Sequence, residues 1–494
     1  MDIRGTRLRK PSDEALAFTS SMADDGRIAR QVILVNMAHM AALVRAGEVD
    51  RRVGAKCMSF LAGASPEIPP RAKSEDFHQQ LEQEAVDLLG VETAGFLNYG
   101  KSRNDQVATA IRMELRGSIL VLVGSILELQ VALLGQAKRN GAMLVPGYTH
   151  LQRAQPTTFA HHLFAHFDAL QRDVERALQL YQRVNQSPMG SAAMAGTSVN
   201  VDRRYVAGLL GFSGLVRNAM DGVSSRDVAV ESLSCATITA LDASRLAEEL
   251  ILWSSSEFGY IELSDAYAAS SSIMPQKKNA VAAEMARAKA GSVLGGLVAA
   301  CAILKALPYA YNLDLQEVTP HLWRAMDDVT STVRVLAGMV ASASPKKERL
   351  ALAVRGDGST AVGLANHLVK GHGVSFRQAH AVVGELVRIS AETGAPLQEV
   401  AASKLADVSA SLGKKVAMES EAIEGILDPA RFLGEVATEG GANPRLIAKE
   451  LKAREDDVTS TRSSLTDRKA ALAAAERKLH TTSVGLAREV KPRD

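Results

Sequence analysis

The chain has 494 residues, 47% of them hydrophobic and 23% charged, and its formal net charge is +2 at pH 7. This composition is ordinary for a globular protein, and the small charge gives no electrostatic reason to expect a nucleic-acid or membrane partner. The three cysteines form no CxxC pattern and no Cys/His cluster, which argues against disulfides and structural zinc. We find no secretory apolar segment and no uninterrupted run of about 18 apolar residues, so a cytoplasmic protein is expected.

Residues 1–102 are predicted to form an N-terminal helical region. Two polar stretches in it, SSMADD (20–25) and EDFH (75–78), combine carboxylates with hydroxyl or imidazole groups. Such side chains cap helices as readily as they contact ligands, so neither stretch indicates a function by itself.

Residues 103–353 are predicted to form a domain of long helices. From residue 103 to about residue 140 no proline occurs, and apolar residues recur every three or four positions, as at Ile111, Leu115 and Ile119. The same pattern continues over 158–185, 227–254 and about 282–307. Long helices that are apolar on more than one face are typical of a bundle core. Separate short helices are a weaker alternative because proline is absent over such lengths.

Polar residues gather at the breaks between these helices, where catalytic groups are often found. The first break, NYGKSRNDQVATA (98–110), places Ser102, Arg103 and Asn104 at a helix start. First-turn N–H groups favour anions, and an arginine can bind a carboxylate bidentately. Taken alone, however, a capped helix with a surface arginine explains these residues better.

The second break, GYTHLQRAQP (147–156), presents Thr149, His150 and Gln152 in a loop that precedes a proline. His150 could shuttle a proton near neutral pH, although a single loop histidine is more often incidental. His162 and His166 follow, four residues apart in a predicted helix. Because no glutamate completes an HExxH pattern, packing or solvation is preferred to a metal site.

The third break, ASSSIMPQKKNA (269–280), combines hydroxyl groups, two ammonium groups and an amide. A serine is a poor base unless positive charge lowers its pKa, and Lys277 and Lys278 could supply that charge. Such a loop could remove a proton beside a carboxylate, stabilise the resulting dianion and close over a substrate. On composition alone, a basic surface loop explains the stretch about equally well.

The last part of the chain changes character. LPYAYNLDLQE (307–317) brings Tyr311, Asn312 and Gln316 to a turn between helices. Beyond about residue 355, shorter helical patterns alternate with glycine and proline, which predicts a small helical domain over 354–450. A charged helical tail is predicted over 451–494.

Together these motifs resemble one family. SSIMPQKKN (271–279) is similar to the signature loop of the fumarase/aspartase superfamily. KSRNDQVAT, PGYTHLQRAQP, WSSSEFGYIELSDAY and AYNLDLQE narrow the resemblance to argininosuccinate lyases and their δ-crystallin relatives. The motifs match in order from about residue 20 to about residue 444.

The resemblance implies both an architecture and a reaction. The architecture is all-α, with three helical domains, and the central long helices form a twenty-helix core in a homotetramer. Each active site would combine loops from three subunits. The reaction is β-elimination of fumarate from a small N-substituted aspartate, with no metal and no organic cofactor.

The resemblance also assigns roles at matching positions. Ser271 would remove the Cβ proton, and Lys277 and Asn279 would stabilise the resulting aci-carboxylate. His150 would be the acid or part of its relay. The remaining matched positions are expected to bind substrate; they are Ser21, Asp25, His78, Ser102, Arg103, Asn104, Thr149, Gln152, Tyr311 and Gln316.

Departures from the family pattern limit how far the substrate can be specified. Asn98, Tyr99 and Lys101 stand where the family has His, Thr and Arg, and Ser270 replaces a glycine. On the amine side, Leu313 replaces a basic residue and Thr319 stands where a lysine helps to hold the arginine end. A lost charge that had been buried and paired would weaken binding by roughly a few kcal/mol.

Three interpretations are therefore weighed. Argininosuccinate is the expected substrate, and another N-succinyl amine, in secondary metabolism or chelator breakdown, is the alternative. A non-catalytic, crystallin-like protein is disfavoured because such a protein would be expected to lose the base or the loop lysine, and both are present.

Overall fold

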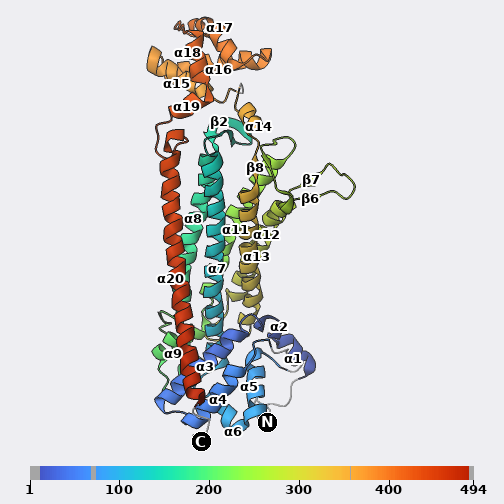
Figure 1. The fold of residues 1–494 in the computed structure, drawn as a ribbon, viewed down its shortest axis with the longest axis vertical. Helices are drawn as coiled ribbons and strands as arrows, with labels where there is room; N and C mark the ends of the chain where they lie inside the picture. The colour runs from blue at the N-terminus through green and yellow to red at the C-terminus, as the bar shows by residue number, and fades with distance from the viewer. Residues whose placement is uncertain (1–11, 68–73, 356–357, 489–494) are drawn as a thin grey trace.

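The computed structural model describes residues 12–67, 74–355 and 358–488. The chain forms a long rod, in which a bundle of long helices separates a group of N-terminal helices from a group of C-terminal ones (Figure 1). Helices dominate the described residues, which confirms the predicted all-α class. The outermost residues of the first and last predicted regions, 1–11 and 489–494, lie outside the described residues.

Long helices form the bundle, and they follow the apolar periodicity of the sequence. They are α7 (Arg103–Asn140), α8 (Phe159–Val184), α11 (Asp227–Ser254), α12 (Val281–Leu304) and α13 (Leu315–Ser342). The predicted helix over 227–254 coincides with α11, and the one over 158–185 exceeds α8 by one residue at each end. The helix predicted to reach about residue 307 ends earlier, at Leu304.

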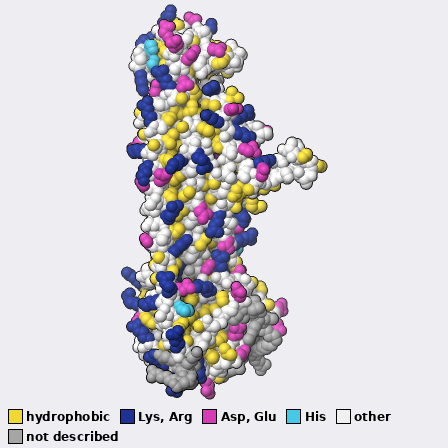
Figure 2. All heavy atoms as spheres, viewed as in Figure 1, with side chains coloured by type: hydrophobic (Ala, Val, Ile, Leu, Met, Phe, Trp, Pro, Cys, Tyr) yellow, Lys and Arg dark blue, Asp and Glu magenta, His cyan; other side chains and the backbone are white. Residues whose placement is uncertain are grey.

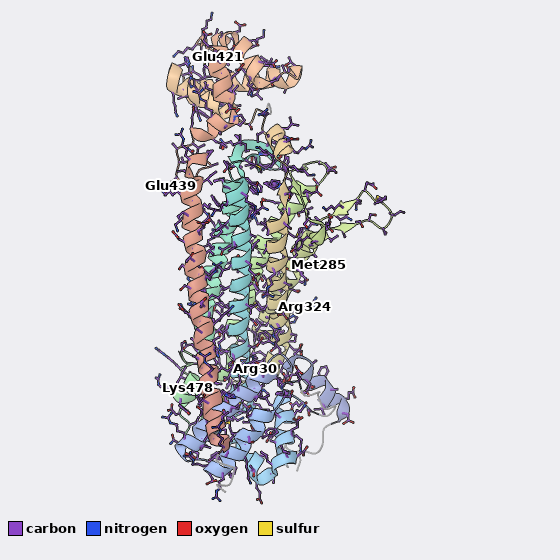
Figure 3. The ribbon with its side chains drawn as sticks, viewed as in Figure 1. Arg30, Met285, Arg324, Glu421, Glu439 and Lys478 are labelled. Atoms are coloured by element: carbon purple, nitrogen blue, oxygen red, sulfur yellow. The ribbon has the colours of Figure 1, made fainter. Side chains whose placement is uncertain are left out.

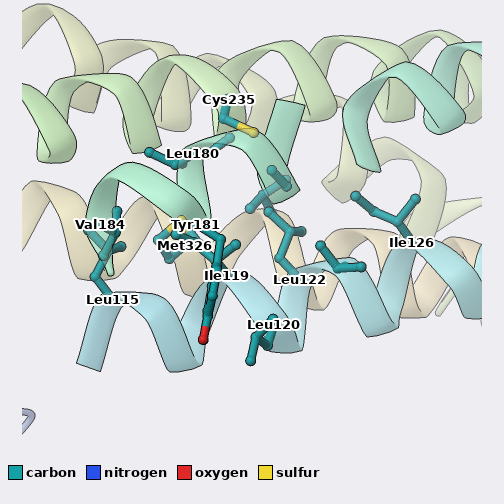
Figure 4. Packing of buried hydrophobic residues seen from close by; sticks show 14 of the residues in the cluster. Leu115, Ile119, Leu120, Leu122, Ile126, Leu180, Tyr181, Val184, Cys235 and Met326 are labelled. Carbon is teal, nitrogen blue, oxygen red and sulfur yellow. The ribbon is translucent and has the colours of Figure 1, made fainter. Parts of the chain in front are cut away.

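The bundle core is built from the predicted apolar face of α7. Leu115, Ile119, Leu122 and Ile126 are at most 1% exposed. Figure 4 shows them beside Leu180, Tyr181 and Val184 of α8, Met326 of α13 and Cys235 of α11. Truncating one such leucine or isoleucine to alanine typically costs about 2–5 kcal/mol, so this face fixes α7 at the centre of the bundle.

Two of the described helices, α7 and α12, are long and apolar enough to span a membrane by length and composition alone. The sequence has no uninterrupted apolar run of this length, since single charged residues such as Glu128 break the run in α7, but the most apolar part of each helix is hydrophobic on average. Of the most apolar window, 61% is buried in α7 but only 22% in α12. The apolar character of α7 therefore belongs to the bundle core, whereas α12 leaves much apolar surface uncovered.

The N-terminal helices pack on one end of the bundle and share its hydrophobic core. They are α1 (Asp13–Thr19), α2 (Met22–Asp25), α3 (Ala29–Ala46), α4 (Arg51–Gly63), α5 (Phe77–Leu89), α6 (Val91–Ala94) and the 3-10 helix η1 (Gly95–Asn98). Two further short helices follow α8 in the chain; they are α9 (Arg203–Leu209) and α10 (Ala219–Ser224).

The C-terminal helices lie at the opposite end, where α15 to α18 enclose a second, separate hydrophobic cluster. The elements are α14 (Lys347–Ala353), α15 (Ala361–His372), α16 (Phe376–Thr393), α17 (Leu397–Ser411), α18 (Ser420–Leu427), α19 (Pro429–Gly434) and the 3-10 helix η3 (Pro444–Leu446). The division of the chain into three domains stays a prediction.

The charged C-terminal segment forms α20 (Ile447–Ala487), which runs back along the bundle to the N-terminal helices (Figure 1). Val458, Leu465 and Leu479 are buried against the rest of the chain. Polar contacts also hold the helix: Arg454 forms an ion pair with Asp168 of α8 at 2.6 Å, and Arg30, labelled in Figure 3, pairs with Glu476. α20 is thus one of the packed helices of the rod.

Short strands occur where the bundle helices connect. They are β1 (Leu144–Thr149), β2 (Gln152–Thr158), β3 (Gln186–Ser187), β4 (Gly214–Leu215), β5 (Ile261–Glu262), β6 (Ala269–Ser270), β7 (Lys278–Asn279) and β8 (Ser344–Pro345), with the 3-10 helix η2 at Asp265–Tyr267. β3 pairs with β4 in parallel, and the pairs β1–β2, β5–β8 and β6–β7 are antiparallel. Two of these pairs, β1–β2 and β6–β7, carry predicted site residues.

Candidate active site

A cavity of about 340 Å³ lies between the N-terminal helices and the adjacent ends of α7 and α13. It brings together residues from five separate stretches of the sequence. The predicted site residues that line it are Ser21, Asp25, His78, Ser102, Arg103, Asn104, Tyr311 and Gln316. This cavity therefore collects most of the positions expected to bind substrate, although no single motif indicated where they would meet.

The start of α7 forms one wall of the cavity. The Ser102 hydroxyl accepts a hydrogen bond from the Asn104 N–H at 3.2 Å, and the Asp105 carboxylate accepts one from the Ser102 N–H at 3.0 Å. Asp105 is buried and also accepts bonds from the backbone N–H groups of Gly190 and Ala192. These contacts fix the first turn of a long helix, whose N-terminus favours a bound anion.

Arg103 is already paired across the cavity with the acidic start of α5. Its guanidinium lies 2.8 Å from Asp76 and 3.2 Å from Glu75. Although burial opposes ionisation, the Arg103 guanidinium and the hydrogen bond from the Gln79 N–H hold the pKa of Asp76 below its usual range. Arg103, the residue predicted to bind a substrate carboxylate, is therefore held in place by two carboxylates, Glu75 and Asp76, of the EDFH stretch.

The cavity wall has more acidic groups than the sequence analysis anticipated. Asp24, Glu75, Asp76 and Glu317 line it together with the predicted Asp25. Local sequence motifs could not reveal this group of carboxylates, because its members come from three segments that are far apart in the chain. An excess of carboxylates suits the binding of a cationic group.

Asp25 is the most deeply placed of these carboxylates. Its Oδ2 accepts hydrogen bonds from the Ser21 hydroxyl at 3.0 Å and from the Phe77 N–H at 2.9 Å. Burial raises the pKa of Asp25 from 3.8 to about 6. The native state therefore binds this proton more tightly than the unfolded chain does, and the resulting stabilisation is complete below pH 3.8 and lost as the pH rises to about 6.

Asp25→Asn is expected to remove this pH dependence, since the amide oxygen still accepts both hydrogen bonds but cannot ionise. The variant should match the wild type in free energy of unfolding near pH 4 and exceed it by up to about 3 kcal/mol at pH 7. Denaturant titrations at several pH values measure the difference. A constant gap between Asp25→Asn and wild type across pH would contradict the assignment.

His78 reaches the cavity from α5 with a defined tautomer. The Lys101 ammonium donates to Asn36 Oδ1, so the Asn36 amide nitrogen faces Gln106 Oε1. That oxygen must then accept a hydrogen bond from His78 Nδ1, which lies 3.1 Å away. Burial lowers the pKa of His78, and within the described residues its buried Nε2 has no hydrogen-bond partner. Nε2 is therefore an unprotonated acceptor available to an N–H or O–H group of a ligand.

Arg226 is a cavity residue that the sequence analysis missed. It immediately precedes α11, is buried, and donates to the carbonyl oxygens of Val223 and Ser225. Burial lowers its pKa to about 10, so it remains a cation at neutral pH. Its position at a helix boundary was the only available signal, and that signal is also typical of ordinary surface arginines.

The positions expected to contact the amine half of a substrate lie in the same cavity, and that role stays a prediction. Tyr311 and Gln316 line the cavity, and the Gln316 amide donates to the Thr19 carbonyl oxygen at 3.2 Å. Leu313 and Thr319, the two departures from the family pattern, line the same cavity. The cavity lining is therefore uncharged at the two positions where the family pattern has basic residues.

Thr149, His150 and Gln152 lie at the other end of the bundle, at the tip of the β1–β2 hairpin (Figure 1). The expectation of a simple loop here was wrong, because residues 144–149 pair with 152–158 in antiparallel register despite the two prolines. At the turn, His150 and Leu151 both have positive φ, of 55° and 57°. Glycine or asparagine usually occupies such a turn, so a histidine and a leucine in this conformation indicate local strain of the kind found at functional sites.

Ser271, Lys277 and Asn279 lie on an arm, residues 269–280, that projects from the side of the bundle (Figure 1). The Ser271 hydroxyl oxygen accepts hydrogen bonds from the backbone N–H groups of Ile273 and Met274, at 3.3 and 3.1 Å. Such donors stabilise a negatively charged oxygen and so favour deprotonation of the serine.

The two arm lysines differ in their surroundings, which corrects the expectation that both act on the serine. The Lys278 ammonium pairs with Glu262 at 2.9 Å and Asp265 at 2.7 Å at the base of the arm. Lys277 is exposed and forms no ion pair with another described residue. Only Lys277 therefore retains an uncompensated charge for a ligand.

The predicted site residues thus form three groups, in the cavity, on the hairpin and on the arm. A single copy of the chain does not bring the groups together, because they lie at different levels of the rod (Figure 1).

Comparisons with known proteins identify the family. A lyase family model matches residues 7–295, and an argininosuccinate lyase C-terminal model matches residues 358–433. The chain is 42% identical to an argininosuccinate lyase of Methanothrix thermoacetophila over 480 residues, covering 97% of this chain and 98% of that protein. The chain belongs to the argininosuccinate lyase family. A second relative, the argininosuccinate lyase of Methanoculleus marisnigri, is 43% identical and covers 88% of each chain.

Solved structures support the same placement for this argininosuccinate lyase family member. An EDDS lyase in complex with formate is 26% identical, with a TM-score of 0.87 over 99% of this chain and 98% of that one. A class II fumarase from Schistosoma mansoni, 16% identical with a TM-score of 0.71, shares the fold. The predicted superfamily is confirmed, and the chain is a carbon–nitrogen lyase.

Proposed function

We propose that this protein cleaves argininosuccinate to arginine and fumarate, as a cytoplasmic step of arginine biosynthesis. The observation that carries the proposal is the charge arrangement of the cavity. The N-terminus of α7 and the buried Arg226 cation, which donates only to backbone carbonyl oxygens, offer positive charge to an anion, while Asp24, Asp25 and Glu317 offer an acidic surface for a cation. A substrate with carboxylates at one end and a guanidinium group near the other has the complementary charges.

The proposed reaction is a β-elimination. Ser271 takes the proton from Cβ, and the electron pair left behind is delocalised into the adjacent carboxylate, next to Lys277 and Asn279. The C–N bond then breaks, its electron pair goes to the leaving nitrogen, and a proton delivered through His150 completes the amine product. The backbone donors to the Ser271 oxygen support this role for the serine.

A homotetramer is part of this proposal because three groups of site residues must meet. α12 leaves apolar side chains exposed, among them Met285 at 58% and Val298 at 60%. Met285 is labelled in Figure 3, and Figure 2 shows hydrophobic side chains at the bundle surface below the arm. Covering these faces with helices of other copies would bury apolar area and could bring an arm and a hairpin to the cavity of a third chain.

One specific observation supports an alternative to argininosuccinate as the substrate. Leu313 and Thr319 line the cavity where basic residues are expected, and the similar EDDS lyase is named for a different substrate. If the lost basic residues are essential for holding the arginine end, the same elimination would act on another N-succinyl amine.

Fumarate release is the direct test. With argininosuccinate, purified protein should produce fumarate and arginine in equal amounts, followed by ultraviolet absorbance and amino-acid analysis. If no fumarate forms, the reverse reaction of fumarate with a panel of amines should identify the amine. Absence of turnover in both directions from a correctly assembled protein would favour a crystallin-like, non-catalytic role.

A further inference from the structure

A cluster of potential metal ligands lies outside the three groups of site residues. His162 and His166 project from α8 toward Glu249 of α11, and both Nε2 atoms approach the same carboxylate oxygen, Oε2, at 2.6 and 2.8 Å. The three ligand atoms lie within 4.8 Å of one another. The reaction proposed above uses none of them.

We propose that His162, His166 and Glu249 bind a divalent transition-metal ion, with Zn²⁺ as the probe of choice. Two histidines four residues apart present their rings on one helix face, and a carboxylate from a second helix completes three ligands. The absence of an HExxH pattern from the sequence does not exclude this cluster, because the glutamate of that pattern is a general base and not a metal ligand. Here the glutamate comes from a helix that begins about sixty residues later.

The observed distances are close to those that an ion requires. Ligand atoms about 2.0–2.1 Å from a tetrahedral ion are roughly 3.4 Å apart. Separating the hydrogen-bonded atoms by about 0.6–0.8 Å would make room, and the Glu249 side chain, 36% exposed, has the freedom to rotate by that amount. Each neutral imidazole would bind the ion through an unprotonated Nε2 and carry its single ring proton on Nδ1.

Neighbouring side chains already hold the ligands in place. The Trp253 ring stacks on His162, with centroids 4.5 Å apart, and the two histidine rings meet edge to face at 5.4 Å. The histidine side chains are only 25% and 14% exposed, so few alternative rotamers are open to them. Such support is what keeps a metal site assembled before the ion arrives.

A cavity of about 300 Å³ adjoins the cluster and leaves space for a fourth ligand. It is lined by both histidines and Glu249, and also by Asp242 and Arg245. Asp242 adds a second carboxylate two helical turns before Glu249, partly balanced by Arg245, whose guanidinium lies 3.9 Å from it. Water or a small anion could occupy the open position, as at three-ligand zinc sites.

The set of ligands favours particular ions. Two imidazoles and one carboxylate suit Zn²⁺, Co²⁺ or Ni²⁺, whereas Mg²⁺ and Ca²⁺ require oxygen ligands almost exclusively. Gly147 and Tyr148 of β1 line the same cavity, immediately before Thr149 and His150. A bound ion would therefore lie beneath the hairpin that carries the proposed acid.

Zinc titration of the full chain tests the inference. The protein, freed of any polyhistidine tag and stripped with a chelator, should bind one Zn²⁺ per chain by calorimetry, and Co²⁺ should give the intense visible bands of a four-coordinate ion. Even loss of an outer-shell partner weakens metal binding by about 10–100-fold, so His166→Phe or Glu249→Gln should raise the Kd by more than about 100-fold. Mg²⁺ should not compete.

His161→Gln is the matched control because His161 is in the same helix but bonds to Thr157 and the Gly440 carbonyl instead. This variant should keep the Zn²⁺ stoichiometry and Kd. His162→Gln provides a second ligand variant if either of the others fails to fold, as judged by circular dichroism. The inference is overturned if the wild type binds no stoichiometric Zn²⁺, or if the ligand variants bind as tightly as His161→Gln. Binding is measured without substrate, so the result does not depend on the proposed activity.

Discussion

Ser271→Ala is expected to lower the rate of fumarate release by about 10²–10⁴-fold or more, because the variant lacks the proposed base. The Ser271 oxygen accepts two backbone N–H bonds in the free arm, so its environment already favours the ionised form. The measurement is kcat for fumarate release, with substrate above the KM of each protein.

Ser270→Gly is the matched control for this experiment. Ser270 lies in β6, one residue before the proposed base, at a position where the family pattern has glycine. This substitution should leave kcat within a few-fold of the wild type. If Ser271→Ala retained comparable turnover while its oligomeric state matched that of the wild type, the base would have to be another group.

The long helices could be predicted from sequence because their cause is local. Continuous apolar spacing without proline over 227–254 is sufficient to define α11, and the face of α7 that includes Leu115 and Ile119 packs as its periodicity predicts. The β1–β2 hairpin was missed because Pro146 and Pro156 are poor strand residues and because its turn lacks the usual Asn-Gly signal. Pairing with the partner strand overrode both local preferences.

The composition of the cavity was harder to predict for a different reason. Arg103 and its partner Asp76 are 27 residues apart, and each has an ordinary explanation as a cap or surface charge when considered alone. Only the packing of α5 against the start of α7 makes them neighbours. The cluster of His162, His166 and Glu249 shows the same limit, since its third member belongs to another helix.

Mixing two inactive variants is expected to restore activity, if active sites are shared between chains as proposed. An Arg103→Gln chain keeps a normal arm, and a Ser271→Ala chain keeps a normal cavity. Within a mixed tetramer, some sites would combine the intact cavity of one chain with the intact arm of another. Co-expressed variants carrying different affinity tags, purified for both tags, should therefore release fumarate far faster than either variant alone.

The informative control is a pair of variants within one arm. Ser271→Ala and Lys277→Ala alter the same segment, 269–280, and every site needs that segment from a single chain. Mixed tetramers of these two variants should stay inactive, because each arm lacks either the base or the ammonium group. Restoration in the Arg103/Ser271 pair but not in the Ser271/Lys277 pair would mean that the cavity and the arm of one site come from different chains. If neither pair recovered although mixed tetramers formed, each site would have to be built within one chain, and the arm would need to fold back along the bundle to reach the cavity.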